Sequence, residues 1–338
     1  MRVVSLQAPG RFAVEERVLP PLPAGHARVR IGAAGVCSSD VARSHGGAYH
    51  HPLVLGHELA GVVEDGGETG VAPGTRVTIF PLLPCFSCDS CAEEEYARCR
   101  DYDYFGSRRD GGFGTHLDVP TWNLLPVPDG VSLDDAALTE PLAVVVHALE
   151  RLGGEGEVAI LGAGFLGLLA AQILHRRGRP VTLLGRHPEK MARALGATTV
   201  PEPEHDSFVA AHSDAFSCVL EAVGAPATLR RSLALAAPGG TVVWMGNPSA
   251  DVELPQALIS RVLRKELAVR GTWNSRYRGR ADSDWTAALG LMREGVRPSA
   301  LVTRRVDLDG VGPLLGRLHE HKAGRVHAPE LKALVVVE

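Results

Sequence analysis

Residues 158–167 read Val-Ala-Ile-Leu-Gly-Ala-Gly-Phe-Leu-Gly, a short apolar run that leads into three glycines. The glycines, Gly162, Gly164 and Gly167, follow a predicted strand and open a predicted helix over residues 165–177. Glycine allows the tight turn and lets a pyrophosphate approach the start of such a helix. The stretch predicts a dinucleotide site that includes Phe165 and Leu166; a purely structural glycine turn is the alternative.

Strands and helices alternate on the carboxyl side of this stretch. We expect strands at 181–184, 216–223, 241–246 and 267–272, and helices at 188–195, 225–237 and 254–265. This alternation predicts an α/β domain with a doubly wound parallel sheet. We expect Val223 and Gly246, at two strand ends, to contact the cofactor. Trp273 and Asn274 follow the last strand and line the nicotinamide side, or only pack and cap there.

The end of the second strand reads Leu184-Gly185-Arg186-His187 and carries no carboxylate. An NAD site usually has an acidic residue at this point, which accepts hydrogen bonds from the ribose hydroxyls. Gly185 leaves room, and the planar cation of Arg186 suits a 2′-phosphate. The segment, His187 included, therefore predicts NADP over NAD, unless Arg186 only stacks on the adenine.

Length and composition agree with two packed domains. The chain has 338 residues, a formal net charge of −4 and 45% hydrophobic residues. This balance argues against nucleic-acid partners, and the apolar runs fall short of the roughly 20 residues of a membrane span. The chain begins without an apolar signal-peptide core, so we expect a cytoplasmic protein. The first third is rich in Gly, Pro and short alternating runs, which predicts a mostly β domain.

Four of the six cysteines, Cys85, Cys88, Cys91 and Cys99, fall within fifteen residues. Four soft ligands in one loop fill a tetrahedral zinc and leave no open position, which is typical of a structural site. The spacing is not the bacterial ferredoxin run, and the acidic insert Glu93-Glu94-Glu95 disfavours contact with a nucleic-acid backbone. Cys218 lies in an apolar strand and is expected to be a buried small hydrophobe.

A second group of metal-ligand types is dispersed along the chain. Cys37, His57 and Glu140 can hold one zinc with a fourth position left for water or substrate. Such a zinc polarises an alcohol oxygen, so that the alkoxide can release hydride. Taken singly, each of the three residues is equally compatible with a structural role.

Together these motifs resemble the zinc-dependent medium-chain dehydrogenases, the alcohol, sorbitol and threonine dehydrogenase superfamily. The resemblance covers nearly the whole chain through Gly35–Asp40, Gly56–Gly61, the four-cysteine lobe, Glu140–Ala143 and the glycine turn. Within that family the chain is most similar to the galactitol-1-phosphate 5-dehydrogenase branch, through residues 81–86, 106–113, 263–267 and 271–273. The resemblance implies a GroES-like catalytic domain at 1–147 and 275–338, with its zinc lobe at about 84–100, and a Rossmann domain at 148–274.

The resemblance also implies roles. Cys37, His57 and Glu140 match the catalytic zinc ligands, Glu58 the neighbouring carboxylate that sometimes joins them, and Ser39 the hydroxyl that passes the substrate proton outward. The four cysteines of the lobe match the ligands of a structural zinc, which makes two zinc ions per chain. The implied substrate is a polyol, cyclitol or sugar, with or without a phosphate, and the implied assembly is a homodimer or homotetramer. A threonine-type or simple-alcohol dehydrogenase, and a non-catalytic zinc-binding member of the fold, are the alternatives.

Three departures from the family pattern stand out: Ser38 replaces the glycine after the catalytic cysteine, Gly185 replaces an acidic residue, and Gly324-Arg325-Val326 replaces Gly-Lys-Val.

Two further groups are candidates for substrate contacts. Tyr49, His50 and His51 are expected near a polyol, and Arg108 and Arg109 either bind a substrate phosphate or tie down the loop beside the cysteine lobe.

Overall fold

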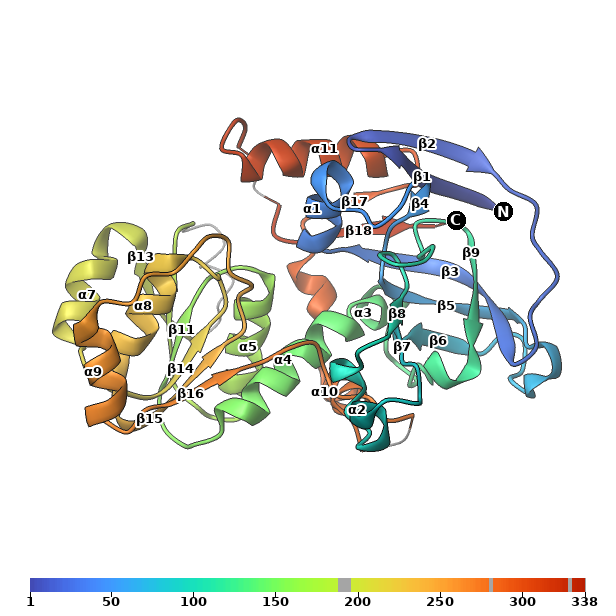
Figure 1. Cartoon of the computed structure of the whole chain (residues 1–338). Helices are drawn as coiled ribbons and strands as arrows, with labels where there is room; N and C mark the ends of the chain where they lie inside the picture. The colour runs from blue at the N-terminus through green and yellow to red at the C-terminus, as the bar shows by residue number, and fades with distance from the viewer. Residues whose placement is uncertain (188–195, 280–281, 328–329, 338) are drawn as a thin grey trace. The chain divides into compact units, whose positions relative to one another are not determined.

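The computed structural model describes all residues except 188–195, 280–281, 328–329 and 338 (Figure 1). The chain divides into two compact units, Met1–Ala143 with Arg276–Glu338, and Val144–Ser275. The division falls within helix α4 (Thr139–Leu152). The helix predicted at 188–195 lies outside the described residues.

The first unit is mostly β. Its elements are β1 (Arg2–Ala8), β2 (Arg11–Glu16), β3 (His26–Val36), α1 (Ser38–Gly46), β4 (Leu53–Val54), β5 (Glu58–Asp65), β6 (Arg76–Ile79), β7 (Leu82–Leu83), α2 (Asp89–Ala92), β8 (Asp103–Tyr104), β9 (His116–Pro120), β10 (Leu124–Pro126), α3 (Leu133–Ala137), α10 (Asp284–Arg293), β17 (Arg304–Val306), α11 (Val311–Lys322) and β18 (Ala333–Val336). A seven-stranded sheet runs in the order β10-β6-β5-β3-β18-β17, with β9 also paired to β3.

The long strand β3 organises this unit, because β5, β9 and β18 all pair with it. Its residues alternate between buried and partly exposed along the first half, and its last four residues are all buried. Val29 and Ile31 of β3 pack into one apolar core with residues of β5 and β18. The buried carboxyl end of β3 leads directly to Cys37, so the core fixes the backbone on which the first candidate site stands.

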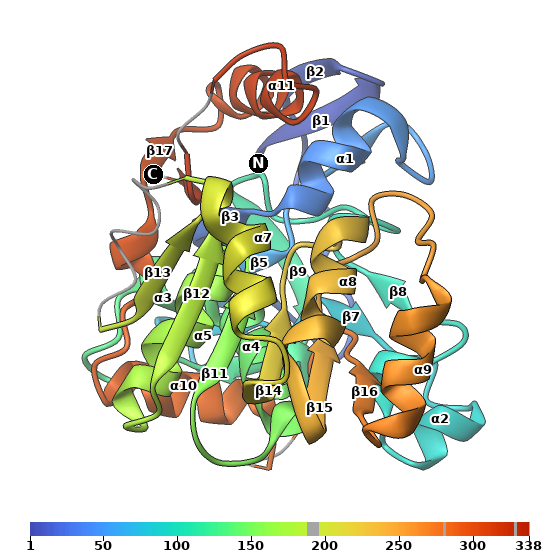
Figure 2. The ribbon, with the colours of Figure 1, turned by 90° about the vertical axis from the view of Figure 1, so that its left-hand side faces the viewer.

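The second unit is a six-stranded parallel sheet with helices on both faces. Its elements are β11 (Val158–Leu161), α5 (Phe165–Arg176), β12 (Val181–Gly185), β13 (Thr198–Pro201), α7 (His205–Ala211), β14 (Phe216–Glu221), α8 (Pro226–Leu235), β15 (Ala236–Trp244), α9 (Gln256–Arg264) and β16 (Ala268–Gly271). The strand order is β13-β12-β11-β14-β15-β16, and all neighbours are parallel. Figure 2 shows the six strands side by side, and Figure 1 shows α7 and α8 on one face and α5 on the other.

This architecture confirms the predicted α/β class with a doubly wound sheet. Every residue of β11 and β12 is buried, as expected where helices cover both faces of a parallel sheet. Several predicted boundaries are wrong. The helix expected at 225–237 ends at Leu235, and the strand expected to reach Gly246 ends at Trp244. The strand expected at 216–223 ends at Glu221, because Val223 and Gly224 turn their amides toward the Glu221 side chain. The strand expected from 241 begins at Ala236.

Candidate active site

The start of helix α1 holds Cys37 in one orientation. Cys37 is the N-cap residue: its Sγ accepts from Ser39 N, and its own amide donates to Asp40 Oδ2 at 2.9 Å. These reciprocal bonds form a capping box in which a thiol takes the place of the usual hydroxyl. The local sequence Cys37-Ser38-Ser39-Asp40 therefore fixes the orientation of the thiol.

Strand pairing brings His57 to Cys37. The antiparallel ladder of β3 and β5 places Gly35 opposite Glu58. Cys37 lies two residues beyond Gly35, and His57 lies one residue before Glu58, so both sit at the same end of the ladder. The ligand atoms of Cys37, His57 and Glu58 all lie within 4.8 Å of one another.

The carboxylate of Asp40 faces the imidazole of His57. Asp40 Oδ1 lies 3.4 Å from His57 Nδ1, and both side chains are buried. Because Nδ1 faces Asp40, Nε2 is the ring nitrogen that can bind a metal together with Cys37. Burial opposes a charge on the ring, but Asp40 and Cys37 together raise the pKa of His57 well above 6.5. A carboxylate behind a histidine in this way orients the ring of a metal ligand.

Glu58 belongs to a buried ion pair at the same place. Its Oε1 accepts from Lys332 Nζ at 2.6 Å, and the two residues are 1% and 7% exposed. Its Oε2 has no hydrogen-bond partner among the described residues. Glu140, the second residue of α4, is also buried close by, and burial raises the pKa of its carboxyl to about 7, with Glu58 adding to the rise and His57 opposing it.

These residues fit a zinc ion. A thiol, an imidazole and a carboxylate with an unpartnered oxygen form a donor set that zinc prefers. Asp40 and Glu140 add two buried acidic groups to Glu58, against the ammonium groups of Lys332 and of Lys322, which donates to the Ser38 carbonyl at 2.9 Å. A buried region with more acidic than basic groups favours a cation. The structure groups Glu58, rather than Glu140, with Cys37 and His57 within 4.8 Å, and Glu140 lies beside that group.

The four-cysteine lobe is preformed for a tetrahedral metal. Its Sγ–Sγ distances are 3.6 Å for Cys88–Cys91 and 3.9 Å for both Cys85–Cys91 and Cys88–Cys99. The edges of a tetrahedron with zinc–sulfur bonds of about 2.3 Å measure roughly 3.8 Å. A disulfide requires about 2.05 Å, and all four cysteines are free. The lobe fits a structural zinc with no open position.

Loss of one lobe ligand is expected to release one zinc and loosen the lobe. In Cys91→Ser the buried thiol is replaced by a poor zinc ligand, so the purified protein should carry one zinc per chain in place of two. Trypsin should then cut faster after Arg98 and Arg100, whose side chains are already 64% and 72% exposed. Cys218→Ser, in β14, is the matched control. Two zinc ions in Cys91→Ser would contradict the assignment.

The glycine turn lies where the sequence places it. β11 ends at Leu161, and α5 begins at Phe165 with Gly164 as its N-cap. A β-carbon on Gly167 would lie 1.9 Å from the carbonyl oxygen of Gly162, so helix and turn approach too closely for any larger residue. Phe165 and Leu166 occupy the first turn of the helix. The arrangement fits a pyrophosphate at the helix N-terminus.

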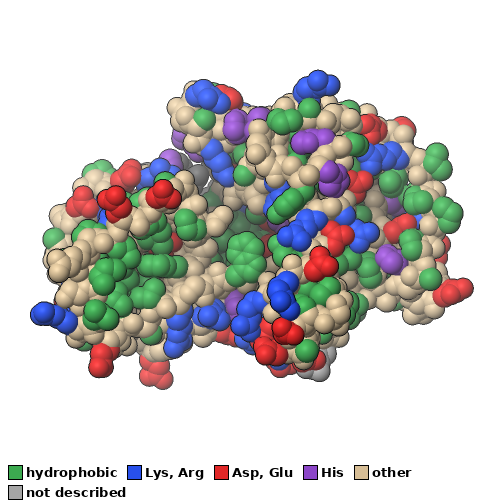
Figure 3. All heavy atoms as spheres, in the orientation of Figure 1, with side chains coloured by type: hydrophobic (Ala, Val, Ile, Leu, Met, Phe, Trp, Pro, Cys, Tyr) green, Lys and Arg blue, Asp and Glu red, His purple; other side chains and the backbone are tan. Residues whose placement is uncertain are grey.

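The other predicted cofactor residues lie at the carboxyl edge of the same sheet. β12 ends at the buried Gly185, followed by the exposed Arg186 and the half-buried His187. Gly246 and Trp273 line a hollow of about 410 Å³ beyond the ends of β15 and β16. Val223 is 39% exposed and Trp273 is 61% exposed, while the Asn274 side chain caps the amide of Ser275. Figure 3 shows hydrophobic side chains gathered over α8 and the start of α9 on this unit.

Arg108 and Arg109 are held by the loop beside the lobe. The Arg108 guanidinium lies 3.9 Å from the centre of the Tyr102 ring and donates to the Tyr102 carbonyl. Arg109 lies 3.5 Å from Asp103 Oδ2. These contacts favour the interpretation that both arginines tie down the loop, rather than bind a phosphate.

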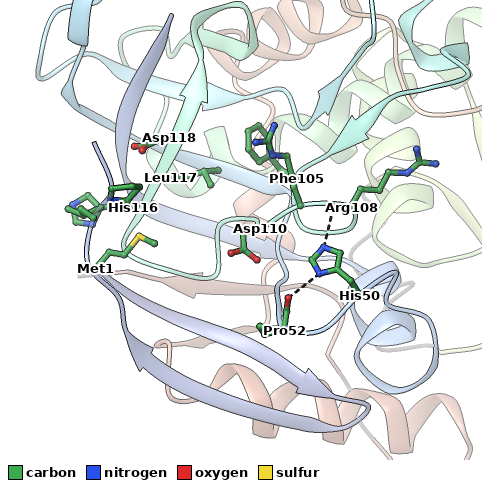
Figure 4. Close-up of a pocket in the computed structure, with 12 residues that line it drawn as sticks. Met1, His50, Pro52, Phe105, Arg108, Asp110, His116, Leu117 and Asp118 are labelled. Atoms are coloured by element: carbon green, nitrogen blue, oxygen red, sulfur yellow. Dashed lines mark hydrogen bonds between the residues drawn. The ribbon is translucent and has the colours of Figure 1, made fainter. Parts of the chain in front are cut away.

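A hollow of about 470 Å³ in the first unit is lined by His50, Arg108 and Asp110, among others (Figure 4). The His50 ring lies between the carbonyl oxygens of Pro52 and Arg108, and the Arg108 side chain points away from Asp110. Asp110 is paired with Arg17 at 2.9 Å and also accepts from the Val54 amide. His50 and Asp110 are therefore both engaged in contacts within the chain.

Sequence reasoning missed two members of the site. Asp40 lies three residues after Cys37, which is the acidic position of a capping box, and this spacing is a readable signal for its role. Lys332 lies 274 residues from Glu58 and carries no local signal for their pairing.

Comparison with known families agrees with this geometry. Residues 23–129 match the alcohol dehydrogenase GroES-like domain, and residues 166–294 match the zinc-binding dehydrogenase family. The chain is 33% identical over 309 residues to galactitol 1-phosphate 5-dehydrogenase of Escherichia coli K12, with 87% of this chain and 89% of the relative covered. It is 30% identical over 321 residues to L-idonate 5-dehydrogenase of Vitis vinifera, with 86% and 84% covered.

Solved structures show the same fold over the whole chain. Galactitol-1-phosphate dehydrogenase from Escherichia coli superposes with a TM-score of 0.86 at 30% identity, covering 99% of this chain and 100% of that one. A zinc-binding dehydrogenase from Sinorhizobium meliloti 1021, bound to NADP, gives a TM-score of 0.87 at 29% identity, with 99% and 98% covered. Among the described helices, none combines the length and apolar character needed to cross a bilayer.

The chain belongs to the zinc-dependent medium-chain alcohol dehydrogenase family, with a GroES-like domain and a Rossmann-like domain. Within that family it is a zinc-dependent dehydrogenase of the polyol and sugar-acid branch.

Proposed function

We propose that the protein oxidises a secondary alcohol of a polyol, cyclitol or sugar, with or without a phosphate, and prefers NADP as the hydride acceptor. The observation that carries the proposal is the group formed by the half-buried Cys37 and the buried His57 and Glu58, whose ligand atoms lie within 4.8 Å, in a chain that also has the glycine turn. The relatives whose names include galactitol 1-phosphate and L-idonate support the substrate class.

Each residue of the site has a defined task in this proposal. Cys37, His57 and a carboxylate from Glu58 or Glu140 would hold the catalytic zinc, and the glycine turn would hold the dinucleotide. When bound, zinc supplies a Lewis acid for the alcohol oxygen, and the nicotinamide supplies the hydride acceptor. Asp40 keeps the His57 ring turned toward the cluster, and Lys332 balances the charge of Glu58. The half-buried Ser39, on the first turn of α1, takes the substrate proton toward solvent.

A substrate panel tests the proposal. Formation of reduced nicotinamide is followed by absorbance with NADP and with NAD, across polyols, cyclitols, sugar phosphates, sugar acids, threonine and simple alcohols. We expect turnover of a polyol, cyclitol or sugar, and loss of that turnover after chelation. Turnover of threonine or a simple alcohol alone would overturn the substrate class.

The NADP preference rests on Gly185 and Arg186. The double variant Gly185→Asp with Arg186→Ile removes a cation that suits a 2′-phosphate and adds an acceptor for the ribose hydroxyls. One charged hydrogen bond contributes about 1.5–3 kcal/mol, so the ratio of kcat/KM for NADP to that for NAD should fall about 10- to 100-fold. Arg177→Ile is the control: Arg177 follows the carboxyl end of α5, away from the glycine turn, so its loss should leave the ratio unchanged. A wild type that already prefers NAD would refute this assignment.

We also propose that the chain works as a homodimer or homotetramer. Helix α9 exposes Ile259 and Leu263, the latter by 72%, next to β16 at the edge of the six-stranded sheet. Such an apolar surface at a sheet edge supports pairing with a second copy. Light scattering on the purified protein measures the size of the assembly, and a monomer at micromolar concentration would refute the proposal.

A further inference from the structure

Glu221 is a buried acidic residue that the proposed chemistry does not use. It is the last residue of β14, in the middle of the parallel sheet, and it is 0% exposed. An ionised carboxylate at such a place is costly unless donors surround it. The donors around Glu221 come from its own chain.

A single oxygen of Glu221 receives three hydrogen bonds from one short segment. Oε1 accepts from the amides of Val223 and Gly224, both at 2.9 Å, and from the hydroxyl of Thr228 at 2.6 Å. Oε2 has no hydrogen-bond partner among the described residues. All the side-chain bonding of Glu221 therefore holds the loop that leads from β14 into α8.

The backbone of Glu221 ties this loop to the next one. Its carbonyl oxygen accepts from the amides of Met245 at 2.8 Å and Gly246 at 3.1 Å, just beyond β15. The two loops also touch directly. Gly224 has φ +76°, and a β-carbon there would lie 2.0 Å from the carbonyl oxygen of Asn247. The loops after β14 and β15 are thus packed together, with Glu221 bonded to both.

The strand order shows which part of a dinucleotide these loops would meet. In a doubly wound sheet the ligand lies at the carboxyl ends of the strands, where the order reverses, and here β11 and β14 flank that point. The pyrophosphate belongs at the glycine turn after β11, and the adenosine half belongs beside β12. The other half of the molecule then extends over the loops after β14 and β15.

We propose that Glu221 is a positioning residue for the nicotinamide half of the cofactor. It acts through Val223, Gly224 and Gly246, whose backbones it holds in one arrangement, and it does not touch the adenosine half. The inference rests on the proposed nicotinamide cofactor. Glu221 keeps the nicotinamide end of the site rigid before the cofactor binds, and this rigidity lowers the entropy cost of binding.

Paired ligands that differ only in the nicotinamide ring test this role. NADH is compared with ADP-ribose, and NADPH with the 2′-phosphate of ADP-ribose, by calorimetric titration of the zinc-loaded protein. In Glu221→Ala the Kd of the reduced dinucleotide should rise about ten-fold or more, since a charged acceptor of three hydrogen bonds is lost, while the Kd of the matching fragment changes less than about two-fold. Glu221→Gln keeps an oxygen acceptor and should restore part of the affinity. The KM for the dinucleotide should rise in the same order.

Glu157→Gln is the matched control. Glu157 also accepts a hydrogen bond from a threonine hydroxyl, that of Thr182 at 2.6 Å. It directly precedes β11, however, and so lies at the amino ends of the strands, away from the cofactor loops. Its ratio of dinucleotide to fragment affinity should equal that of the wild type. If Glu221→Ala does not fold, Thr228→Val removes one of the three bonds and should shift the ratio about three-fold.

Each outcome has one meaning. An unchanged ratio in folded Glu221→Ala, or in Thr228→Val where the alanine variant does not fold, overturns the positioning role and leaves the proposed function intact. Equal losses of dinucleotide and fragment affinity also overturn it, because the whole site would then have been disturbed. A wild type that binds neither dinucleotide overturns the proposed function itself.

Discussion

Cys37→Ala is expected to lose turnover by more than about a thousand-fold, because the zinc that polarises the alcohol oxygen contributes several kcal/mol to the transition state. The variant removes one of three ligand groups that lie within 4.8 Å of one another. Metal analysis should find one zinc per chain, held by the four-cysteine lobe, where the wild type holds two. Circular dichroism should show an unchanged fold, since Cys37 is at a helix start and only half-buried.

Cys218→Ala separates this effect from the loss of any thiol. Cys218 is a buried cysteine of β14 whose Sγ lies 3.4 Å from the carbonyl oxygen of Gly153, and it belongs to neither metal-ligand group. This control should keep two zinc ions and wild-type turnover. Substantial turnover by Cys37→Ala would refute the assignment of the catalytic zinc.

Lys332→Met is expected to cause the largest loss of stability. Lys332 is 7% exposed and donates to Glu58 Oε1 at 2.6 Å, and burial opposes its charge while Glu58 holds the pKa of the ammonium above its ordinary value. Removing one member of a buried pair leaves the other charge without a partner and costs about 3–5 kcal/mol. Urea unfolding of the zinc-free protein, followed by tryptophan fluorescence, measures the shift of the midpoint without a metal ion that could replace Lys332 as the partner of Glu58.

The double variant Lys332→Met with Glu58→Leu tests the cause. Replacing both charges by apolar groups of similar size removes the unpaired carboxylate, so most of the lost stability should return. Arg325→Met breaks the exposed pair with Glu320 and should change the midpoint little, because solvent screens such a pair. A Lys332→Met protein as stable as the wild type would show that the buried pair of Lys332 and Glu58 does not stabilise the fold.

Local patterns in the sequence predict the second unit well, because each βα step carries its own signal. The apolar run at Val158–Leu161 and the glycines after it fix β11 and the start of α5 without reference to the rest of the chain. The error at the end of β14 has a different cause: the Glu221 side chain accepts hydrogen bonds from the amides of Val223 and Gly224, and hydrophobic periodicity does not report such bonds.

The candidate active site could be predicted only in part. Cys37 and His57 stand in recognisable motifs, but their meeting depends on the register of β3 against β5. The partner of Glu58 depends on β18, which pairs with β3 from the far end of the chain. No spacing rule connects positions 58 and 332, because a long-range contact of this kind is set by the sheet and not by local sequence.

Turnover measured against zinc content, while a chelator removes the metal stepwise, tests the catalytic zinc most directly. We expect two zinc ions per chain at the start, and turnover that falls in proportion to the occupancy of the Cys37 site and returns when zinc is added back. Turnover that persists after both zinc ions are gone would contradict the zinc-dependent mechanism.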